Sequence, residues 1–210
     1  MPDSARGAFP SDRLELAVRY VELLATDGVE RGLIGPREAD RIWERHVFNC
    51  LAVASAIGPS ASVVDLGSGA GLPGLVLAIG RPDLAMTLVE PLLRRTTFLD
   101  EVVTELGLDN VRVVRGKAET LHGVEDFDVV TARALAPLDR LLGWAMPLVA
   151  PDGVLLAMKG SSAAEETRAA ASTLRSLRCG PAEVLELSSS DGSSTATVVR
   201  VARAAGPRLG

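Results

Sequence analysis

The chain has 210 residues, of which 47% are hydrophobic, 23% are charged and only 3% are aromatic, as expected for one ordinary globular domain with an appendage. The net charge of −5 excludes a general attraction to nucleic acid, so a polyanion would have to meet a local basic patch. The few aromatic rings argue against an RNA-binding surface built on base stacking.

Two helices are predicted before residue 59. Residues 1–10 are rich in proline, glycine and charge and are expected to be loosely ordered. A helix is expected from Ser11, which can cap it, to about Ala25, because apolar residues recur at helical spacing. After a glycine-rich break, a second helix is predicted from about Arg37 to Ile57, ended by Gly58-Pro59.

Short apolar runs alternate with helical patterns from residue 59 onwards. The predicted strands are Ser62–Leu66, Met86–Glu90, Val111–Arg115, Phe127–Ala132, Val154–Lys159, Glu183–Leu187 and Thr195–Ala202. The predicted helices are Leu72–Ile79, Leu92–Leu106, Leu138–Val149 and Glu165–Leu177. This alternation indicates an α/β fold with a doubly wound, mostly parallel seven-stranded sheet.

The last two predicted strands are joined by Ser188–Ser194, a segment of turn formers that indicates a hairpin. The last strand should therefore be antiparallel, a feature that methyltransferase sheets share and dinucleotide-binding sheets usually lack. We divide the chain into an N-terminal helical extension, residues 1–58, and an α/β domain, residues 59–210.

Several other classes of protein lack support. Cys50 and Cys179 are too far apart in sequence to suggest a disulfide framework or a zinc motif, so no metal site is predicted. The first ten residues lack the pattern of a signal peptide, and no apolar run approaches the roughly 20 residues of a membrane span. A soluble cytoplasmic protein is the default expectation.

A glycine-rich loop, Asp65-Leu66-Gly67-Ser68-Gly69-Ala70-Gly71, joins the first predicted strand to the following helix. Glycines at the carboxyl end of a strand permit a sharp turn and a close approach of ligand to backbone. Gly67-x-Gly69-x-Gly71 fits a nucleoside-binding methyltransferase turn, yet Gly69-x-Gly71-x-x-Gly74 fits a dinucleotide fingerprint equally well. Glu90, after the second strand, suits the ribose hydroxyls of either ligand.

Two features favour S-adenosylmethionine over a dinucleotide or a purely structural turn. Asp65 precedes the first glycine, where an anion suits a ligand with an amino group and a sulfonium better than a pyrophosphate. Ala118-Glu119 follows the third strand, where a backbone amide and a carboxylate could read an adenine edge. Glu90 and Glu119 could otherwise be solvated loop acids.

A set of motifs in order along the chain carries a more specific resemblance. The motifs are Arg45-His46, Asp65-Leu66-Gly67-Ser68-Gly69-Ala70-Gly71-Leu72-Pro73-Gly74, Ala118-Glu119, Thr131-Ala132-Arg133-Ala134 and Met158-Lys159-Gly160. Over about residues 11–203 the chain resembles the bacterial small-subunit ribosomal RNA methyltransferase G family, also called glucose-inhibited division protein B. The resemblance implies the class I, Rossmann-like methyltransferase fold.

The resemblance also implies transfer of a methyl group to N7 of one guanine in the decoding-region loop of small-subunit (16S) rRNA. It implies cofactor contacts at Gly67, Leu72, Ala118, Glu119 and Arg133. Family members often carry Asn-Leu-Thr before the second helix and Asp after the Arg-His pair. This chain has Gly32-Leu33-Ile34-Gly35 and Asn49 there, so the roles of those polar positions do not carry over directly.

The residues are compatible with that reaction. An exocyclic-amine methyltransferase typically has Asn/Asp-Pro-Pro-aromatic after the fourth strand, where this chain has Thr131–Ala134. A cytosine-C5 enzyme needs a cysteine nucleophile, and neither Cys50 nor Cys179 is well placed by sequence. Guanine N7 is a bare lone pair, so it needs positioning rather than a general base.

Two residues have competing interpretations. Arg133 should end the fourth strand among apolar residues, so it needs a ligand or a carboxylate partner. It is the best candidate for positioning the reactants. His46 falls on the apolar face of its helix, with Ile42, Val47 and Cys50, where a structural role competes with a role in shaping the site.

The candidates for RNA contacts are Lys159, Arg45, His46, Arg94 and Arg95. Arg37, Arg41 and Arg45 share one helical face, although such a stripe is more often simply solvated. The expected partner is the small ribosomal subunit or its rRNA, with no membrane and no evident protein partner. Two alternatives stay open: a small-molecule methyltransferase and a non-catalytic, S-adenosylmethionine-binding assembly factor.

Overall fold

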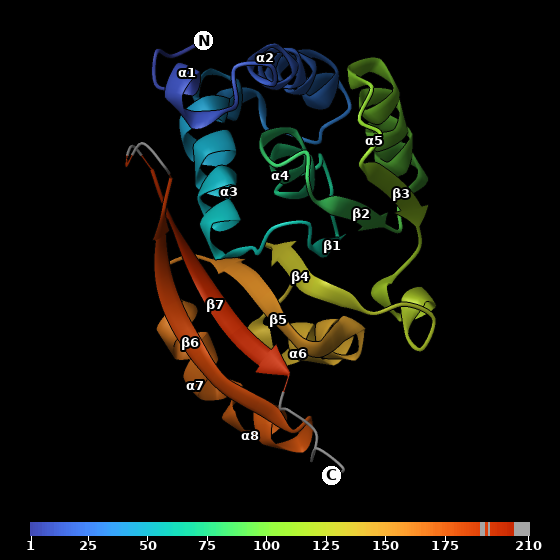
Figure 1. Ribbon diagram of the computed structural model, residues 1–210, viewed down its shortest axis with the longest axis vertical. Coiled ribbons are helices and arrows are strands. Elements are labelled where there is room, and N and C mark those ends of the chain that lie inside the picture. Colours follow the sequence, from blue (N-terminus) through green and yellow to red (C-terminus); the bar gives the residue numbers. More distant parts are fainter. Residues whose placement is uncertain (190–191, 193, 204–210) are drawn as a thin grey trace.

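The computed structural model describes residues 1–189, 192 and 194–203 of the chain, and its centre is one seven-stranded sheet (Figure 1). The strands are β1 Ser62–Leu66, β2 Ala85–Glu90, β3 Val111–Arg115, β4 Phe127–Arg133, β5 Val149–Lys159, β6 Cys179–Ser188 and β7 Thr195–Arg203. Their order is β3-β2-β1-β4-β5-β7-β6. Strand β7 is antiparallel to both of its neighbours and the other pairs are parallel, as the sequence predicts.

Helices cover both faces of the sheet (Figure 1). They are α1 Ala5–Ala8, α2 Leu14–Leu23, α3 Asn49–Ala52, α4 Gly74–Gly80, α5 Leu93–Leu106, α6 Leu138–Ala145, α7 Ala163–Ala169 and α8 Ala171–Ser176. One core packs the first five helices on one face, and a second packs α6 to α8 on the other. Neighbouring strand residues alternate between the cores: Val63 belongs to the first and Val64 to the second.

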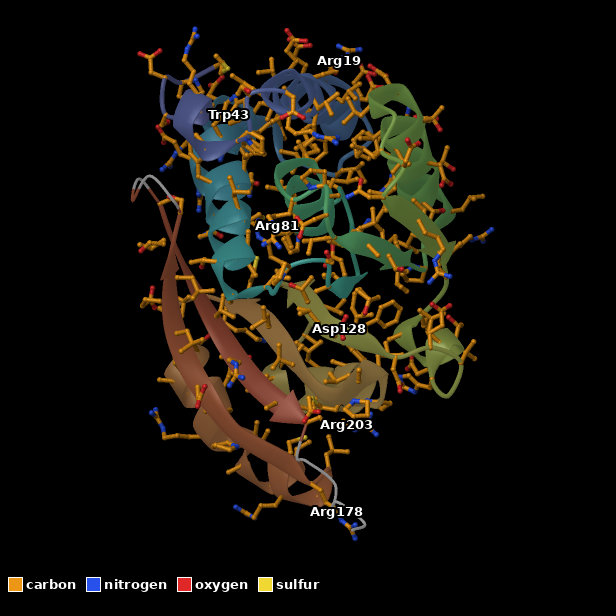
Figure 2. All side chains as sticks on the ribbon, in the orientation of Figure 1. Arg19, Trp43, Arg81, Asp128, Arg178 and Arg203 are labelled. Atoms are coloured by element: carbon orange, nitrogen blue, oxygen red, sulfur yellow. The ribbon has the colours of Figure 1, made fainter. Side chains whose placement is uncertain are left out.

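Two expectations for the N-terminus are wrong. Residues 1–10 are not loose, because α1 buries Ala5 completely and the ring of Phe9 meets the ring of Trp43 edge-on at 6.4 Å (Figure 2). Ser11 does not cap the next helix, because a turn comes first and α2 begins at Leu14 without a side-chain cap. Apolar contacts made far along the chain override the local composition in both places.

The second predicted helix is helical but irregular. It runs through a 3₁₀ segment Pro36–Arg41, a π segment Trp43–Phe48, α3, and a 3₁₀ segment Val53–Ala56. The regular four-residue spacing assumed for Arg37, Arg41 and Arg45 is therefore not maintained along this stretch. A π segment, Leu24–Gly28, likewise extends α2.

Most differences in the sheet are at element ends. Strand β5 begins at Val149 instead of Val154, with a register shift opposite Phe127–Val129, so α6 and a 3₁₀ turn end before Val149. Strand β6 begins four residues early, at Cys179. The helix predicted over Glu165–Leu177 is divided into α7 and α8. Residues 190, 191 and 193 of the predicted hairpin loop lie outside the described residues.

The N-terminal 58 residues share the core of the α/β domain. Tyr20, Ile42 and Cys50 belong to the same buried cluster as β1 and α4. Arg81, after α4, donates to the backbone carbonyl oxygens of Ala54, Ile57 and Gly58 at 3.0–3.2 Å (Figure 2). This segment is therefore a wall of the domain. Within the described residues no helix is both long and apolar enough to span a membrane.

Candidate functional site

The glycine loop lies at the carboxyl end of β1, between β1 and α4. Gly67, Gly69 and Gly71 have φ of +67°, +57° and +95°, a region that L side chains rarely adopt. A Cβ on Gly67 would lie 2.5 Å from the Leu135 side chain, whereas one on Gly69 would meet nothing closer than 3.8 Å. The loop exposes backbone at Gly69 and holds it near the carboxylate of Glu90.

Glu90, the last residue of β2, supports the loop from the side. Its fully buried carboxylate accepts hydrogen bonds from the backbone N–H of Gly69 at 3.1 Å and of Leu92 at 3.0 Å. Arg95 Nη1 lies 3.5 Å from the same carboxylate. A carboxylate has about four acceptor positions, so Glu90 keeps capacity for a ligand hydroxyl.

Asp65 lies beneath the loop rather than in contact with a ligand cavity. Its buried Oδ2 accepts the backbone N–H of Gly74, at the start of α4, at 3.1 Å. Burial raises the pKa of this carboxyl to about 7. The carboxylate therefore occupies the helix N-terminus where a dinucleotide would need to place its pyrophosphate. This geometry disfavours the dinucleotide alternative.

Two cavities flank the loop on either side of Leu135. The smaller, of about 240 Å³, is lined by apolar residues together with Ala118, Glu119 and Trp144. The larger, of about 570 Å³, is lined by the loop backbone, Leu72, Glu90 and Arg133, among others. A planar ring fits the first cavity and a polar chain with hydroxyl groups the second. The open glycine backbone, Glu90 and these cavities together suit an adenosyl cofactor such as S-adenosylmethionine.

Arg133, at the end of β4, is held by the segment before β1. Its guanidinium donates to His46 Nδ1 at 2.6 Å, to Cys50 Sγ at 3.2 Å and to the carbonyl oxygen of Arg45 at 3.4 Å. No carboxylate of the described residues forms an ion pair with Arg133, so a ligand, the other partner that the sequence predicts, stays a prediction. Three neutral acceptors therefore satisfy the partly buried guanidinium at this strand end.

His46 connects Arg133 to Glu38. Since the guanidinium is always a donor, Nδ1 must accept, and the proton is on Nε2, which lies 3.1 Å from Glu38 Oε2. Burial and the charge of Arg133 lower the pKa of His46. His46 is therefore a neutral, buried residue that holds Arg133, and its role in shaping the active site stays a prediction.

Cys50 is close to the site in space, although its place in the sequence indicates otherwise. Its buried thiol contacts Arg133, and burial raises its pKa to about 11. A thiol that stays protonated at neutral pH is a poor nucleophile. The conclusion that Cys50 does not attack a base therefore stands, for a different reason.

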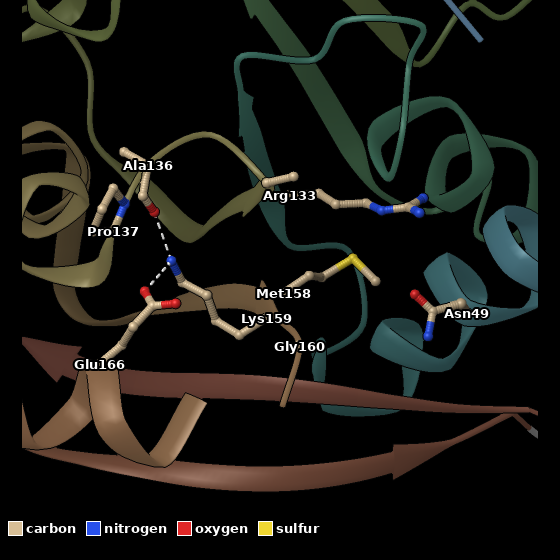
Figure 3. A pocket seen from close by; sticks show the side chains of 9 residues that line it. Asn49, Arg133, Ala136, Pro137, Met158, Lys159, Gly160 and Glu166 are labelled. Carbon is tan, nitrogen blue, oxygen red and sulfur yellow. Dashed lines mark hydrogen bonds and ion pairs between the residues drawn. The ribbon is translucent and has the colours of Figure 1, made fainter. Parts of the chain in front are cut away.

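A third cavity, of about 490 Å³, lies on the other side of Arg133, between β4, β5 and α3 (Figure 3). Its walls include Asn49, Met158 and Lys159. Lys159 Nζ forms an ion pair with Glu166 at 2.7 Å and donates to the carbonyl oxygen of Ala136 at 2.6 Å. Its side chain is only 8% exposed, so it is not a free cation for an RNA phosphate.

The other predicted RNA contacts are divided. His46 is buried, and Arg95 lines the larger of the two cavities beside the glycine loop. Arg45 is about half exposed and lies 3.7 Å from Glu38, and Arg94 is exposed on the surface beside Leu92 and Leu93. Arg45 and Arg94 therefore have accessible side chains, and the side chain of Arg95 is 38% exposed.

Sequence reasoning did not identify four residues of the site. Glu38 holds His46, Leu135 lies against Gly67, Trp144 lines the smaller cavity, and Tyr20 donates its hydroxyl to the Ala70 carbonyl oxygen at 2.8 Å. Only Tyr20 had a usable signal, as the single tyrosine of the chain on an otherwise apolar helical face. Among the residues described, no three His, Cys, Asp or Glu side chains gather closely enough to hold a metal ion.

Comparison with known proteins agrees with this geometry. Residues 13–193 match the family described as "GidB: rRNA small subunit methyltransferase G". The chain is 64% identical over 201 residues to a protein of Nocardioides sp. named ribosomal RNA small subunit methyltransferase G, covering 96% of this chain and 80% of that protein. A protein of the same name from Thermobifida fusca is 55% identical over 199 residues, covering 95% and 84%.

Solved structures of methyltransferases share the fold at low sequence identity. The M1A22 tRNA methyltransferase TrmK of B. subtilis superposes with a TM-score of 0.56 at 16% identity, covering 75% of this chain and 65% of that one. The precorrin-6y C5,15-methyltransferase of Geobacter metallireducens gives a TM-score of 0.53 at 13% identity, covering 81% and 89%. These two likenesses support the fold alone.

Proposed function

Because the chain belongs to the rRNA small subunit methyltransferase G family, we propose that it methylates N7 of one guanine in the decoding-region loop of 16S rRNA. The chain is an S-adenosylmethionine-dependent rRNA methyltransferase. One observation supports this site for the reaction: Arg133 lines both the larger cofactor cavity and the third cavity. We therefore propose that the junction between donor and acceptor lies at Arg133.

The cofactor would be held by the loop and by the ends of β2 and β3. We assign the backbone of Gly67, Gly69 and Gly71, with Leu72, to the larger cavity. Glu90 would accept the ribose hydroxyls, and Ala118 and Glu119 would face the adenine edge in the smaller cavity. Asp65 would act indirectly, by holding the start of α4 through the backbone N–H of Gly74.

Bound S-adenosylmethionine supplies an electrophilic methyl group, so the protein must supply alignment. Guanine N7 has no proton to remove, and the described residues at the junction, Arg133 and His46, are a cation and a neutral imidazole held by each other. Their fixed geometry orients the acceptor, and orientation of two reactants can by itself provide a large part of a rate enhancement.

The partner would be the small ribosomal subunit or its rRNA, and we propose a cytoplasmic location because the substrate is there. The exposed side chains of Arg45 and Arg94 would contact phosphates of the RNA. We also propose that the chain divides between residues 58 and 59, with residues 1–58 forming a wall of the site.

The test is transfer of a labelled methyl group from S-adenosylmethionine to small subunits purified from a strain that lacks this enzyme. We expect label in the RNA, and little label in subunits from the parent strain, which already carry the methyl group. Label in small molecules of a cell extract, with none in RNA, would favour a small-molecule methyltransferase. A folded, cofactor-binding protein that labels nothing would favour an assembly factor.

A further inference from the structure

Asn49, the first residue of α3, has its side chain fixed by a distant strand. Its amide Nδ2 donates to the backbone carbonyl oxygen of Thr195, on β7, at 2.6 Å. The amide nitrogen is thereby turned towards β7, and the carbonyl Oδ1 lies on the side of Met158 and Arg133 (Figure 3). No described residue donates a hydrogen bond to Oδ1, so Asn49 presents an acceptor to the third cavity.

The rest of the cavity wall offers few competing polar groups. Lys159 is occupied by Glu166 and the Ala136 carbonyl oxygen, as Figure 3 shows. Met158 and Pro137 give the cavity apolar surface, and Arg133 closes the side that adjoins the cofactor cavity. The volume of about 490 Å³ lies within the range of about 300–1,000 Å³ of small-ligand sites. A flat base with a donor edge fits these walls.

Guanine presents its polar groups in a fixed order: N7, then O6, then the donors N1–H and N2–H₂. The walls present a matching order from the cofactor cavity outwards, with the donor Arg133 first and the acceptor Asn49 beyond it. With N7 towards the cofactor, O6 would meet Arg133 and the donor edge would meet Asn49 Oδ1. Adenine carries an acceptor at N1 and no amino group at C2, so it would leave Oδ1 unpaired.

We propose that this cavity is the acceptor-base pocket and that Asn49 selects guanine by accepting a hydrogen bond from its 2-amino group. The proposal rests on the proposed function, because it takes the acceptor to be a guanine of RNA.

The test compares methyl transfer to two reconstituted small subunits, one with guanine and one with inosine at the target nucleotide. Inosine lacks only the 2-amino group. We expect the wild-type protein to prefer guanine by about tenfold in kcat/KM, the discrimination of one good base contact. Asn49→Ala should reduce this preference to about one. Comparing the ratio between variants cancels any effect of inosine on the RNA itself.

Asn110 provides a matched control. Its side chain also donates to backbone carbonyl oxygens, those of Ala78 and Leu84 at 3.1–3.2 Å, and it is remote from the third cavity. Asn110→Ala should keep the guanine preference even if it lowers the melting temperature. A structural role of Asn49 alone would lower stability and leave the ratio unchanged.

A second variant keeps the proposal testable if Asn49→Ala does not fold. Gly160 lines the cavity, and a Cβ there meets nothing within 4 Å, so Gly160→Phe can fill the pocket without a clash in the core. We expect kcat/KM for subunits to fall at least tenfold while the cofactor Kd changes less than twofold. A full guanine preference in Asn49→Ala, or normal transfer by Gly160→Phe, would contradict the proposal that the third cavity binds the acceptor base. Failure of the wild-type protein to methylate either subunit would instead overturn the proposed function.

Discussion

The two sides of the site differ in how far along the chain their contacts reach. On the cofactor side, Asp65 holds Gly74 nine residues away and Glu90 holds Gly69 across 21 residues. On the acceptor side, Arg133 is held by residues 83 to 88 positions earlier, and Asn49 is fixed by Thr195 across 146. A local motif therefore builds the first side, and only the assembled fold builds the second.

The largest expected effect is on the acceptor side. Arg133→Ala leaves the Nδ1 of His46 without a donor and removes the group shared by both cavities, so we expect kcat/KM to fall by about 100-fold or more. Methyl transfer to small subunits and a thermal melt measure the two consequences separately. Arg200→Ala is the control, because Arg200 pairs with half-exposed Glu183 on β6. Turnover within threefold of wild type would contradict the role of Arg133.

On the cofactor side, the open backbone at Gly69 should be needed for affinity. Gly69→Ala puts a methyl group where the loop backbone meets the larger cavity, and we expect the Kd for S-adenosylmethionine to rise about tenfold, measured by calorimetry. Gly107→Ala is matched, since Gly107 has a φ of +60°, an uncrowded Cβ position and a place at the end of α5. Both variants should lose about 1–2 kcal/mol of stability. If both weakened cofactor binding equally, the loss would come from reduced stability and not from the position of Gly69 at the cofactor site.

The connection between His46 and Arg133 should show as a pH dependence. The folded-state pKa of His46 is lowered, so the folded protein binds fewer protons than the unfolded chain below pH 6.5. Protonation of Nδ1 would expel the Arg133 contact, and activity and stability should both fall as pH decreases from 6.5 through that folded-state pKa. His46→Gln, which does not titrate, should work within several-fold of wild type at pH 8 and lose this acid limb. If His46→Gln lost activity at acid pH as the wild type does, a group other than His46 would cause that loss.

The smallest expected effect on turnover is at Asp65. Its pKa is raised to about 7, so the folded protein holds a proton that the unfolded chain releases near pH 4. Stability should therefore fall as pH rises from about 4 to about 7, by at most roughly 4 kcal/mol for a shift of about three units. Asp65→Asn keeps an acceptor for Gly74, should flatten this slope in thermal melts, and should leave transfer within about threefold. Parallel melting curves would show that Asp65 is not the titrating group.

Much of the fold and of the cofactor side could be predicted from the sequence because their signals are local. The limits of β1 and β3 agree with the apolar runs, and the glycines of the loop have the positive φ that their type permits. The mostly parallel sheet and its antiparallel last strand follow from the alternation of elements and the closing hairpin. These features depend on residues within about one supersecondary unit of each other.

The acceptor side could not be predicted because side chains select partners only after the chain has folded. Lys159 has the position expected of an RNA contact, yet Glu166 and a carbonyl oxygen satisfy it. Cys50 and Asn49, in the second helical region, reach the site only because residues 1–58 pack against the sheet. Burial near a distant strand end leaves no periodic signal in the sequence.

The most direct test of the assigned reaction is the chemical position of the transferred methyl group. Small subunits methylated in vitro are treated with borohydride and aniline, which cleave RNA at 7-methylguanosine, and the cut is mapped by primer extension. We expect one cleavage, at a guanine in the decoding-region loop, that disappears with Arg133→Ala. Methyl label in the RNA without cleavage would place the methyl group elsewhere than N7 and contradict the alignment of reactants at Arg133.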